Sequence, residues 1–250
     1  MSINACADQL ILALADREQI LALTHYARDP DMSFYADRAE GLPTIRGDAE
    51  EVLKLKPDLV LAGSFTRSAT RAQLAAQSIR IVTFSPARSI EDVKKHIREV
   101  ASLVGQETRG DTLVAEIDAA FANLRPSSRP LRALQLQRRA FAAGTDTLIH
   151  DIMQRLGIVN AATDLGIRYV GRTSLEAVLK AKPDVLILDS ADPGAVDQGV
   201  ALLSHPALEE LVPRHRRIVI PSSQIVCASP GIALAARTLR DAAERILDEK

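Results

Sequence analysis

Apolar positions in this chain follow two different periods, one helical and one typical of buried strands. Ile90, Val93 and Ile97 recur at helical spacing, whereas residues 59–64 form a nearly continuous apolar run. Helical spacing of this kind predicts an amphipathic helix. A short continuous run is typical of a parallel strand that is covered on both faces. The pattern therefore predicts an α/β protein with helices on the faces of parallel sheets.

One stretch of this pattern occurs twice. Residues 48–64 read DAEEVLKLKPDLVLAGS and residues 174–190 read SLEAVLKAKPDVLILDS, which are identical at 8 of 17 positions with an offset of 126. Each copy predicts a short helix, a Pro-Asp turn and an apolar strand, because the residue before proline avoids helical geometry. A copy at nearly half the chain length predicts two similar α/β lobes with a ligand cleft between them.

The remaining elements continue the alternation of strand and helix. The helix that follows Gly105 ends at the linker-like stretch 125–130, and it is long enough to cross about 25–30 Å. We interpret residues 1–104 as an N-terminal lobe, 105–126 as a single backbone helix between lobes, and 127–250 as a C-terminal lobe. Further predicted helices are 7–14, 68–77, 147–156, 196–203 and 231–247, and further predicted strands are 20–26, 79–84, 131–137 and 217–221.

Composition excludes several classes of protein. The 31 basic and 32 acidic residues give a net charge of −1 without long charged runs, so nucleic-acid binding is not expected. No apolar stretch reaches 18 residues, so no membrane span is predicted. The chain opens at Met1 inside a predicted strand, without a signal segment. The protein is then either cytosolic, or its signal peptide has been removed or omitted.

Motifs for common chemistries are missing from the sequence. No phosphate-binding loop, dinucleotide-binding glycine motif or nucleophile elbow occurs. The five histidines are scattered without metal-ligand spacing, and a dedicated metal site is not predicted. We therefore expect no catalytic residues, no metal ligands and no cofactor.

Arginine and aromatic residues gather instead in predicted loops at strand ends. Guanidinium groups at the mouth of a cleft suit carboxylates and other planar oxyanions, and aromatic rings add flat apolar surface. Any single one of these side chains also fits an ordinary surface or packing role. The candidate ligand-binding residues of this kind are Arg28, Arg46, Arg67, Arg138, Arg139, Arg172, Tyr26, Phe65, Phe141 and Tyr169.

The opening residues 2–10, the segment 53–62 and the Ala228-Ser229-Pro230 turn resemble a known family across essentially the whole chain. This family comprises the periplasmic binding proteins for cobalamin and ferric siderophores that serve ABC importers, the helical-backbone class. The resemblance implies two α/β lobes joined by one long helix. It places Tyr26, Phe65, Tyr169 and Gln224 at ligand-contact positions.

Asn4, Cys6 and Cys227 complete the candidate site, because they fall in loops expected to face the cleft. One cysteine is predicted in each lobe, and two hypotheses describe their role. The two cysteines are either unrelated packing thiols, or they meet across the cleft floor, where they contact the ligand or form a disulfide.

The resemblance implies a non-enzymatic, monomeric and periplasmic binding protein that delivers a ferric siderophore or a corrinoid to an ABC permease. The chain lacks Trp, which favours an anionic ferric chelate over a corrin ring. The family docks through an acidic residue on each lobe. Residues 67–71 contain no acid, and Asp192 and Asp197 are available in the second half, so no docking residue is assigned. A stand-alone ligand sensor or scavenger and a chelatase-like enzyme are the alternatives.

Overall fold

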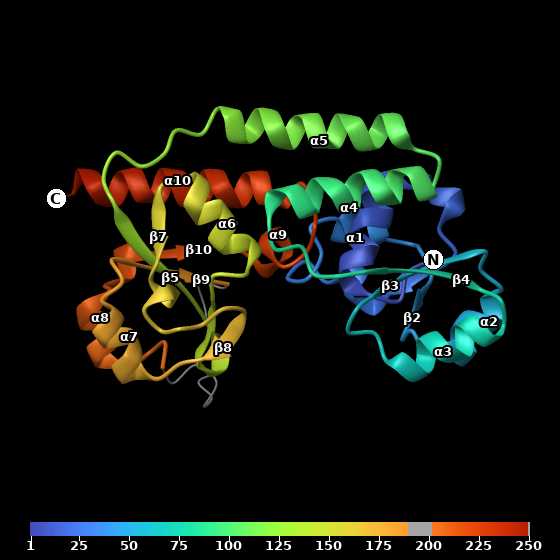
Figure 1. Ribbon diagram of the computed structural model, residues 1–250, viewed down its shortest axis with the longest axis horizontal. Coiled ribbons are helices and arrows are strands. Elements are labelled where there is room, and N and C mark those ends of the chain that lie inside the picture. Colours follow the sequence, from blue (N-terminus) through green and yellow to red (C-terminus); the bar gives the residue numbers. More distant parts are fainter. Residues whose placement is uncertain (190–201, 250) are drawn as a thin grey trace. The chain divides into compact units, whose positions relative to one another are not determined.

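Both copies of the repeated segment fold into the same helix–turn–strand arrangement in the computed structural model (Figure 1). Helix α2 (Ala49–Leu55) leads to strand β3 (Leu59–Gly63), and helix α7 (Leu175–Ala181) leads to strand β9 (Val185–Leu188). Each helix ends at a lysine in the left-handed conformation with φ 47°, which turns the chain before the proline. The sequence prediction for both segments is confirmed.

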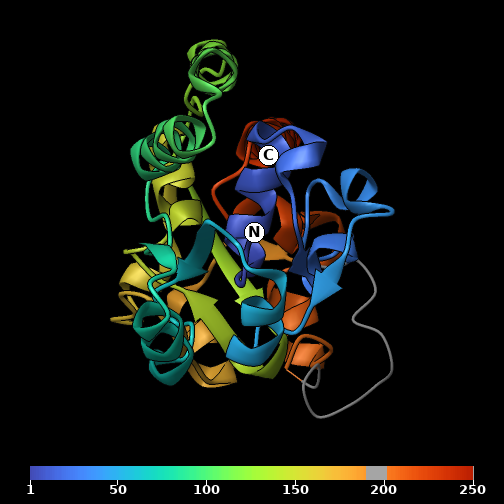
Figure 2. The same ribbon diagram turned by 90° about the vertical axis from the view of Figure 1, so that its right-hand side faces the viewer.

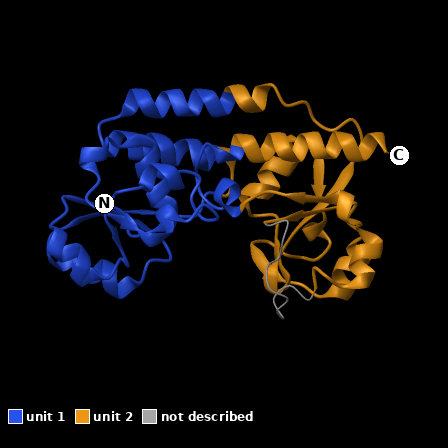
Figure 3. Ribbon diagram, turned by 180° about the vertical axis from the view of Figure 1, so that it is seen from behind, with its two compact units in different colours: residues 1–87, 91–118, 222–232 blue, residues 88–90, 119–221, 233–250 orange. Residues whose placement is uncertain are grey.

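The structure describes residues 1–189 and 202–249, and this part of the chain divides into two compact units (Figure 3). Unit 1 comprises 1–87, 91–118 and 222–232, and unit 2 comprises 88–90, 119–221 and 233–250. Each unit is considered by itself below, and the predicted domain boundaries stay a prediction. Asp192, Asp197 and most of the predicted helix 196–203 lie outside the described residues.

The parallel strands of unit 1 are linked through the first residues of the chain. Strand β3 pairs with β4 (Arg80–Phe84), and β1 (Leu23–Thr24) pairs with β2 (Thr44–Ile45), both in parallel. Residues 1–3 join these pairs, because the Ile3 amide donates to the Leu61 carbonyl at 3.0 Å and the Ser2 amide donates to Ala22 at 3.1 Å. The predicted strand 20–26 is shorter than expected, since a 3-10 turn occupies residues 25–28.

Helices cover the sheet of unit 1. Val60 and Ala62 of β3 pack in a core with residues of α2 and of α3 (Ser68–Ala76). Helix α1 (Ala5–Leu14) contacts β3 as well. Helices α4 (Ile90–Leu103) and α5 (Glu107–Ala122) follow, and α9 (Ser222–Ile225) belongs to the segment that returns to unit 1. The predicted helical face of α4 is buried at Val93, Ile97 and Val100.

Unit 2 is built on a sheet of six strands among its described residues. The path β10–β9–β5–β6–β8 is extended by β7, which pairs with β5. Alternate residues of β5 point to opposite faces, and Leu134 and Leu136 pack with α7 and α8. Figures 1 and 2 show α6 and α10 on the other side of the sheet. The elements are β5 (Leu131–Gln137), β6 (Phe141–Ala143), α6 (Leu148–Arg155), β7 (Ile158–Asn160), β8 (Val170–Arg172), α8 (Pro206–Leu211), β10 (Arg217–Val219) and α10 (Gly231–Asp248).

Three short strands of unit 2 (β6, β7 and β8) and helix α8 were not foreseen from the sequence. Their runs of three to six residues are too short to show a period. Among the described residues, no helix combines the length and the apolar character needed to cross a membrane.

Candidate functional site

Two arginine side chains contact the ring of Tyr169 in unit 2. The guanidinium carbon of Arg88 is 4.7 Å from the centre of the Tyr169 ring, and that of Arg168 is 5.7 Å away. Both distances are within the range of a cation–π contact. The Tyr169 side chain is 49% exposed, so its ring is open to a ligand. The three side chains together offer a flat surface with positive charge at its sides.

A close crossing of two backbone segments holds Tyr169 in place. The amides of Gly144, Thr145 and Asp146 donate to the carbonyls of Tyr169, Ile167 and Arg168, respectively. A methyl group at residue 144 would lie 2.2 Å from the Ile167 carbonyl oxygen. Only glycine allows backbones to approach this closely. Asp146 also forms an ion pair of 2.9 Å with Arg168, so the same segment positions one of the two guanidinium groups.

A second arginine–aromatic contact joins β6 to β8. Phe141 and Arg172 are direct partners in the antiparallel register, and the Arg172 guanidinium carbon is 5.8 Å from the Phe141 ring centre. The Arg172 Nε donates to the carbonyl of Arg139 at 3.4 Å. Arg138 and Arg139 are exposed. We call the set Arg88, Arg139, Phe141, Arg168, Tyr169 and Arg172 the basic aromatic cluster.

One residue of this cluster lines a groove of about 720 Å³ in unit 2. Arg172 lines it together with Leu165, Ile167 and Lys180, and the buried hydroxyl of Thr173 has no hydrogen-bond partner within the described part of the chain. Apolar walls with a few polar groups are typical of small-molecule sites. Of the predicted site residues, Arg172 is the one that lines a described hollow.

Unit 1 carries a disulfide between Cys6 and Cys227, whose Cα atoms are 4.9 Å apart. Asn4 caps α1 next to it, since its side-chain oxygen accepts hydrogen bonds from the Cys6 and Ala7 amides at 3.0 and 3.2 Å. Of the hypotheses left open by the sequence, the disulfide is therefore the one present. One cysteine per lobe was expected, whereas residues 222–232 belong to unit 1 and both cysteines lie in this unit. The local sequence around Pro230 and the turn before α10 did not indicate that residues 222–232 pack in unit 1.

The other predicted residues of unit 1 lie at its surface. Phe65 is 87% exposed and Tyr26 is 43% exposed, with the Tyr26 ring 4.0 Å from that of His25. Arg67 approaches Asp48 at 3.8 Å with a largely exposed side chain, and Arg46 is exposed. An 87% exposed phenylalanine directly after a strand is the strongest feature of this group, because exposure of so large an apolar ring costs free energy in water.

Two predicted residues have internal roles. The Arg28 guanidinium donates to the carbonyls of Leu42 and Ala39, so part of its donor capacity holds the loop 36–42 in place. Gln224 lies in α9, half-buried, and its side-chain oxygen has no hydrogen-bond partner among the described residues. A ligand that donates a hydrogen bond would satisfy this oxygen. Ligand contact by each predicted residue stays a prediction.

Asp8 is a buried carboxyl group in the first turn of α1. It accepts hydrogen bonds from the Thr24 amide at 3.0 Å and from the Thr24 hydroxyl at 2.5 Å. Burial raises the pKa of Asp8 to about 6, although these hydrogen bonds act in the opposite direction. Asp8 thereby ties α1 to the turn that carries Tyr26.

Sequence reasoning missed Arg88 and Arg168. Arg88 lies 81 residues before Tyr169 and follows β4, a strand end of the same kind as those that carry the predicted arginines. Its position after a strand was the signal by which Arg88 could have been included among the candidate residues. Arg168 is adjacent to a predicted site residue, but neither pairing with Tyr169 follows from local sequence. Among the described residues, no group of three His, Cys, Asp or Glu side chains is arranged to hold a metal ion.

Comparisons with known proteins assign the chain to a family. The model of the periplasmic binding protein family matches residues 1–214, and the chain belongs to this family. Its members bind ligands, which confirms the expectation that the chain is not an enzyme.

Named relatives bind cobalamin or haem. The chain is 26% identical to the cobalamin-binding protein of Halobacterium salinarum over 75% of this chain and 52% of that protein. It is 25% identical to the ABC transporter substrate-binding lipoprotein YvrC of Bacillus subtilis over 60% of this chain and 51% of that protein. The match thus spans about half the length of these curated relatives. The apo structure of the periplasmic haem-binding protein RhuT from Roseiflexus is 26% identical with a TM-score of 0.74, and 97% of each chain is covered.

Proposed function

We propose that this chain is the substrate-binding component of an ABC importer and that its ligand is an anionic metal chelate with flat unsaturated rings. The observation that carries this proposal is the basic aromatic cluster, in which Arg88 and Arg168 contact the exposed ring of Tyr169. Family membership and the names of the relatives support a metal chelate as the class of ligand.

The chemistry of the cluster favours an anion over a neutral ligand. Four guanidinium groups provide hydrogen-bond donors that match carboxylate and phenolate oxygens. Tyr169 and Phe141 provide flat faces on which a conjugated ring stacks. A haem carries two carboxylates on a flat ring, and a ferric catecholate carries net negative charge on aromatic rings, so either satisfies both requirements.

Cobalamin is the second candidate, and the name of the Halobacterium protein favours it. A corrin ring is large and less strongly charged, so it gains less from arginine and more from apolar surface. Phe65, which is 87% exposed in unit 1, is available for such a contact.

Titration of the purified protein with hemin, a ferric tris-catecholate and cyanocobalamin distinguishes these candidates. We expect an anionic chelate to bind and the Arg88→Gln/Arg168→Gln variant to weaken it about tenfold or more. Arg214→Gln is the matched control, because Arg214 lies in the same unit on an exposed ion pair with Glu209. Binding of cyanocobalamin alone would support the second candidate, and no binding of any of the three would overturn the chelate proposal.

We further propose that the protein works outside the cytoplasm and hands its ligand to a permease. The Cys6–Cys227 disulfide supports this location, because structural disulfides persist mainly in oxidising compartments. Deletion of the gene in the natural host is expected to abolish uptake of the labelled chelate. A protein found reduced and in the cytoplasmic fraction would contradict the proposed location.

A further inference from the structure

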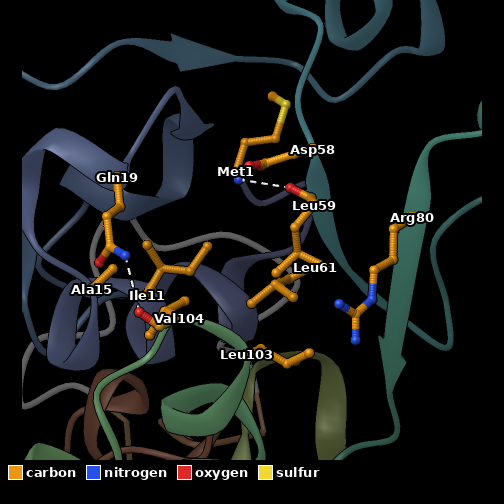
Figure 4. A pocket seen from close by; sticks show the side chains of 10 residues that line it. All are labelled: Met1, Ile11, Ala15, Gln19, Asp58, Leu59, Leu61, Arg80, Leu103 and Val104. Carbon is orange, nitrogen blue, oxygen red and sulfur yellow. Dashed lines mark hydrogen bonds between the residues drawn. The ribbon is translucent and has the colours of Figure 1, made fainter.

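Unit 1 contains a cavity of about 300 Å³ that none of the predicted site residues lines (Figure 4). The apolar part of its walls comes from separate elements: Ile11 of α1, Leu61 of β3, Leu103 at the end of α4 and Val104 just after it. A hydrogen bond of 2.9 Å from the Gln19 side chain to the Val104 carbonyl closes one side.

Two cationic groups line this cavity: the Met1 amino terminus, which donates a hydrogen bond to the Leu59 carbonyl at 2.9 Å, and the guanidinium of Arg80. Figure 4 shows the Arg80 side chain, from the first residue of β4, extending toward Leu103. The Arg80 side chain, at an exposed position, makes no hydrogen bond or ion pair with any described residue. The carboxylate in the lining, Asp58, lies beside Met1 in the same view. The cavity therefore has one end at Arg80 that suits an anion and a separate end where the Asp58 carboxylate lies beside the Met1 ammonium.

The cavity lies where β3 and β4 begin, at the ends of these strands opposite to the loop that carries Phe65. Asp58 and Arg80 are at or just before the first residues of β3 and β4. Phe65 and Arg88 follow the last residues of the same two strands. Because β3 and β4 run parallel in register over five residues, the two ends are separated by the length of the strands.

We propose that this cavity is a second binding site, for a small amphipathic monocarboxylate. A volume of about 300 Å³ is at the lower end of ligand pockets and accommodates an apolar tail against Ile11, Leu61 and Leu103. The carboxylate pairs with the guanidinium of Arg80, whose planar fork matches it in geometry. The site is independent of the proposed chelate site.

Octanoate is a suitable probe, with octyltrimethylammonium as a probe of the same tail and opposite charge. We expect octanoate to bind and to shift the NMR methyl signals of Ile11, Leu61 and Leu103. Arg80→Gln should weaken binding about tenfold or more, since it removes a charge-assisted contact. Arg98→Gln is the control, because Arg98 lies in unit 1 on an exposed ion pair with Asp111 and outside the cavity. Leu103→Trp fills the cavity from a half-buried position and should abolish octanoate binding.

Three outcomes would overturn the proposal: no octanoate binding at millimolar concentration, equal affinity in Arg80→Gln, or equal affinity for the cationic probe. Each is measured on the folded 250-residue chain, with thermal unfolding as the check on folding. Chelate titrations of the same variants should be unchanged, so a failure here leaves the chelate proposal as it stands.

Discussion

The two copies of the repeated segment have the same local structure but different surroundings. In unit 1, β3 pairs with β4 and, on its other side, with the first residues of the chain. In unit 2, β9 is an inner strand between β5 and β10. Unit 1 is further held by a disulfide and a buried carboxyl group, whereas unit 2 relies on the backbone crossing at Gly144. Similar sequence thus gives the same local structure, and long-range contacts decide how each copy is held.

Among the changes that test this comparison, removal of the disulfide should have the largest effect on the unfolding free energy. The bond closes a loop with a sequence separation of 221, and loss of a native disulfide typically costs about 2–5 kcal/mol of unfolding free energy. We expect Cys6→Ala/Cys227→Ala to lose this amount in urea unfolding. A reducing agent should lower the stability of the native chain equally and leave the double variant unchanged. Equal stability of the oxidised and reduced native chains would contradict a stabilising role.

Asp8 should make unit 1 sensitive to pH. Its pKa is raised from 3.8 to about 6 by burial, so the folded protein holds a proton that the unfolded chain has released. The contribution of Asp8 is fully present below pH 3.8 and is lost as the pH rises through about 6, and it amounts to about 3 kcal/mol. Asp8→Asn should flatten this dependence and stabilise the protein at pH 8. A native-like slope between pH 4 and 6 in the variant would assign the dependence to other groups.

Glycine-to-alanine substitutions should differ in their stability loss between the two units, because the new methyl group contacts backbone in one unit and a side chain in the other. At residue 144 it meets backbone, 2.2 Å from a carbonyl oxygen, whereas at Gly63 it meets the side chain of Asn4 at 2.4 Å. We expect Gly144→Ala to cost about 1–3 kcal/mol and Gly63→Ala to cost less, because a side chain moves more easily than backbone. Gly144→Ala should also weaken chelate binding by displacing Tyr169 and Arg168. The reverse order of stability loss would contradict this distinction.

The smallest expected difference lies within the repeat itself. Lys54 forms an i,i+4 ion pair of 3.0 Å with Glu50 in α2. In α7, the equivalent Glu176 instead has its pKa lowered by a hydrogen bond with Ser174. Lys54→Ala should cost about 0.3–0.5 kcal/mol at low salt, and less at 1 M salt. Lys180→Ala should show no measurable loss in the same denaturation assay, and an equal loss in both variants would contradict the assignment.

The sequence by itself determined the elements whose signal is local. Helical spacing, the lysine–proline turns and the apolar runs placed α2, β3, α7 and β9 nearly at their observed bounds. Motifs of the same segments carried the family assignment. Such features are readable because they depend on residues within one or two turns of each other.

Only the tertiary structure decided which residues far apart in the sequence are in contact. It placed Cys227 in unit 1 beside Cys6, set Arg88 against Tyr169 and buried Asp8 under Thr24. It also formed the cavity around Arg80 from α1, two strands and the end of α4. These contacts join residues separated by 16 to 221 positions. No local period encodes such contacts, because they depend on how the whole chain packs its apolar surface.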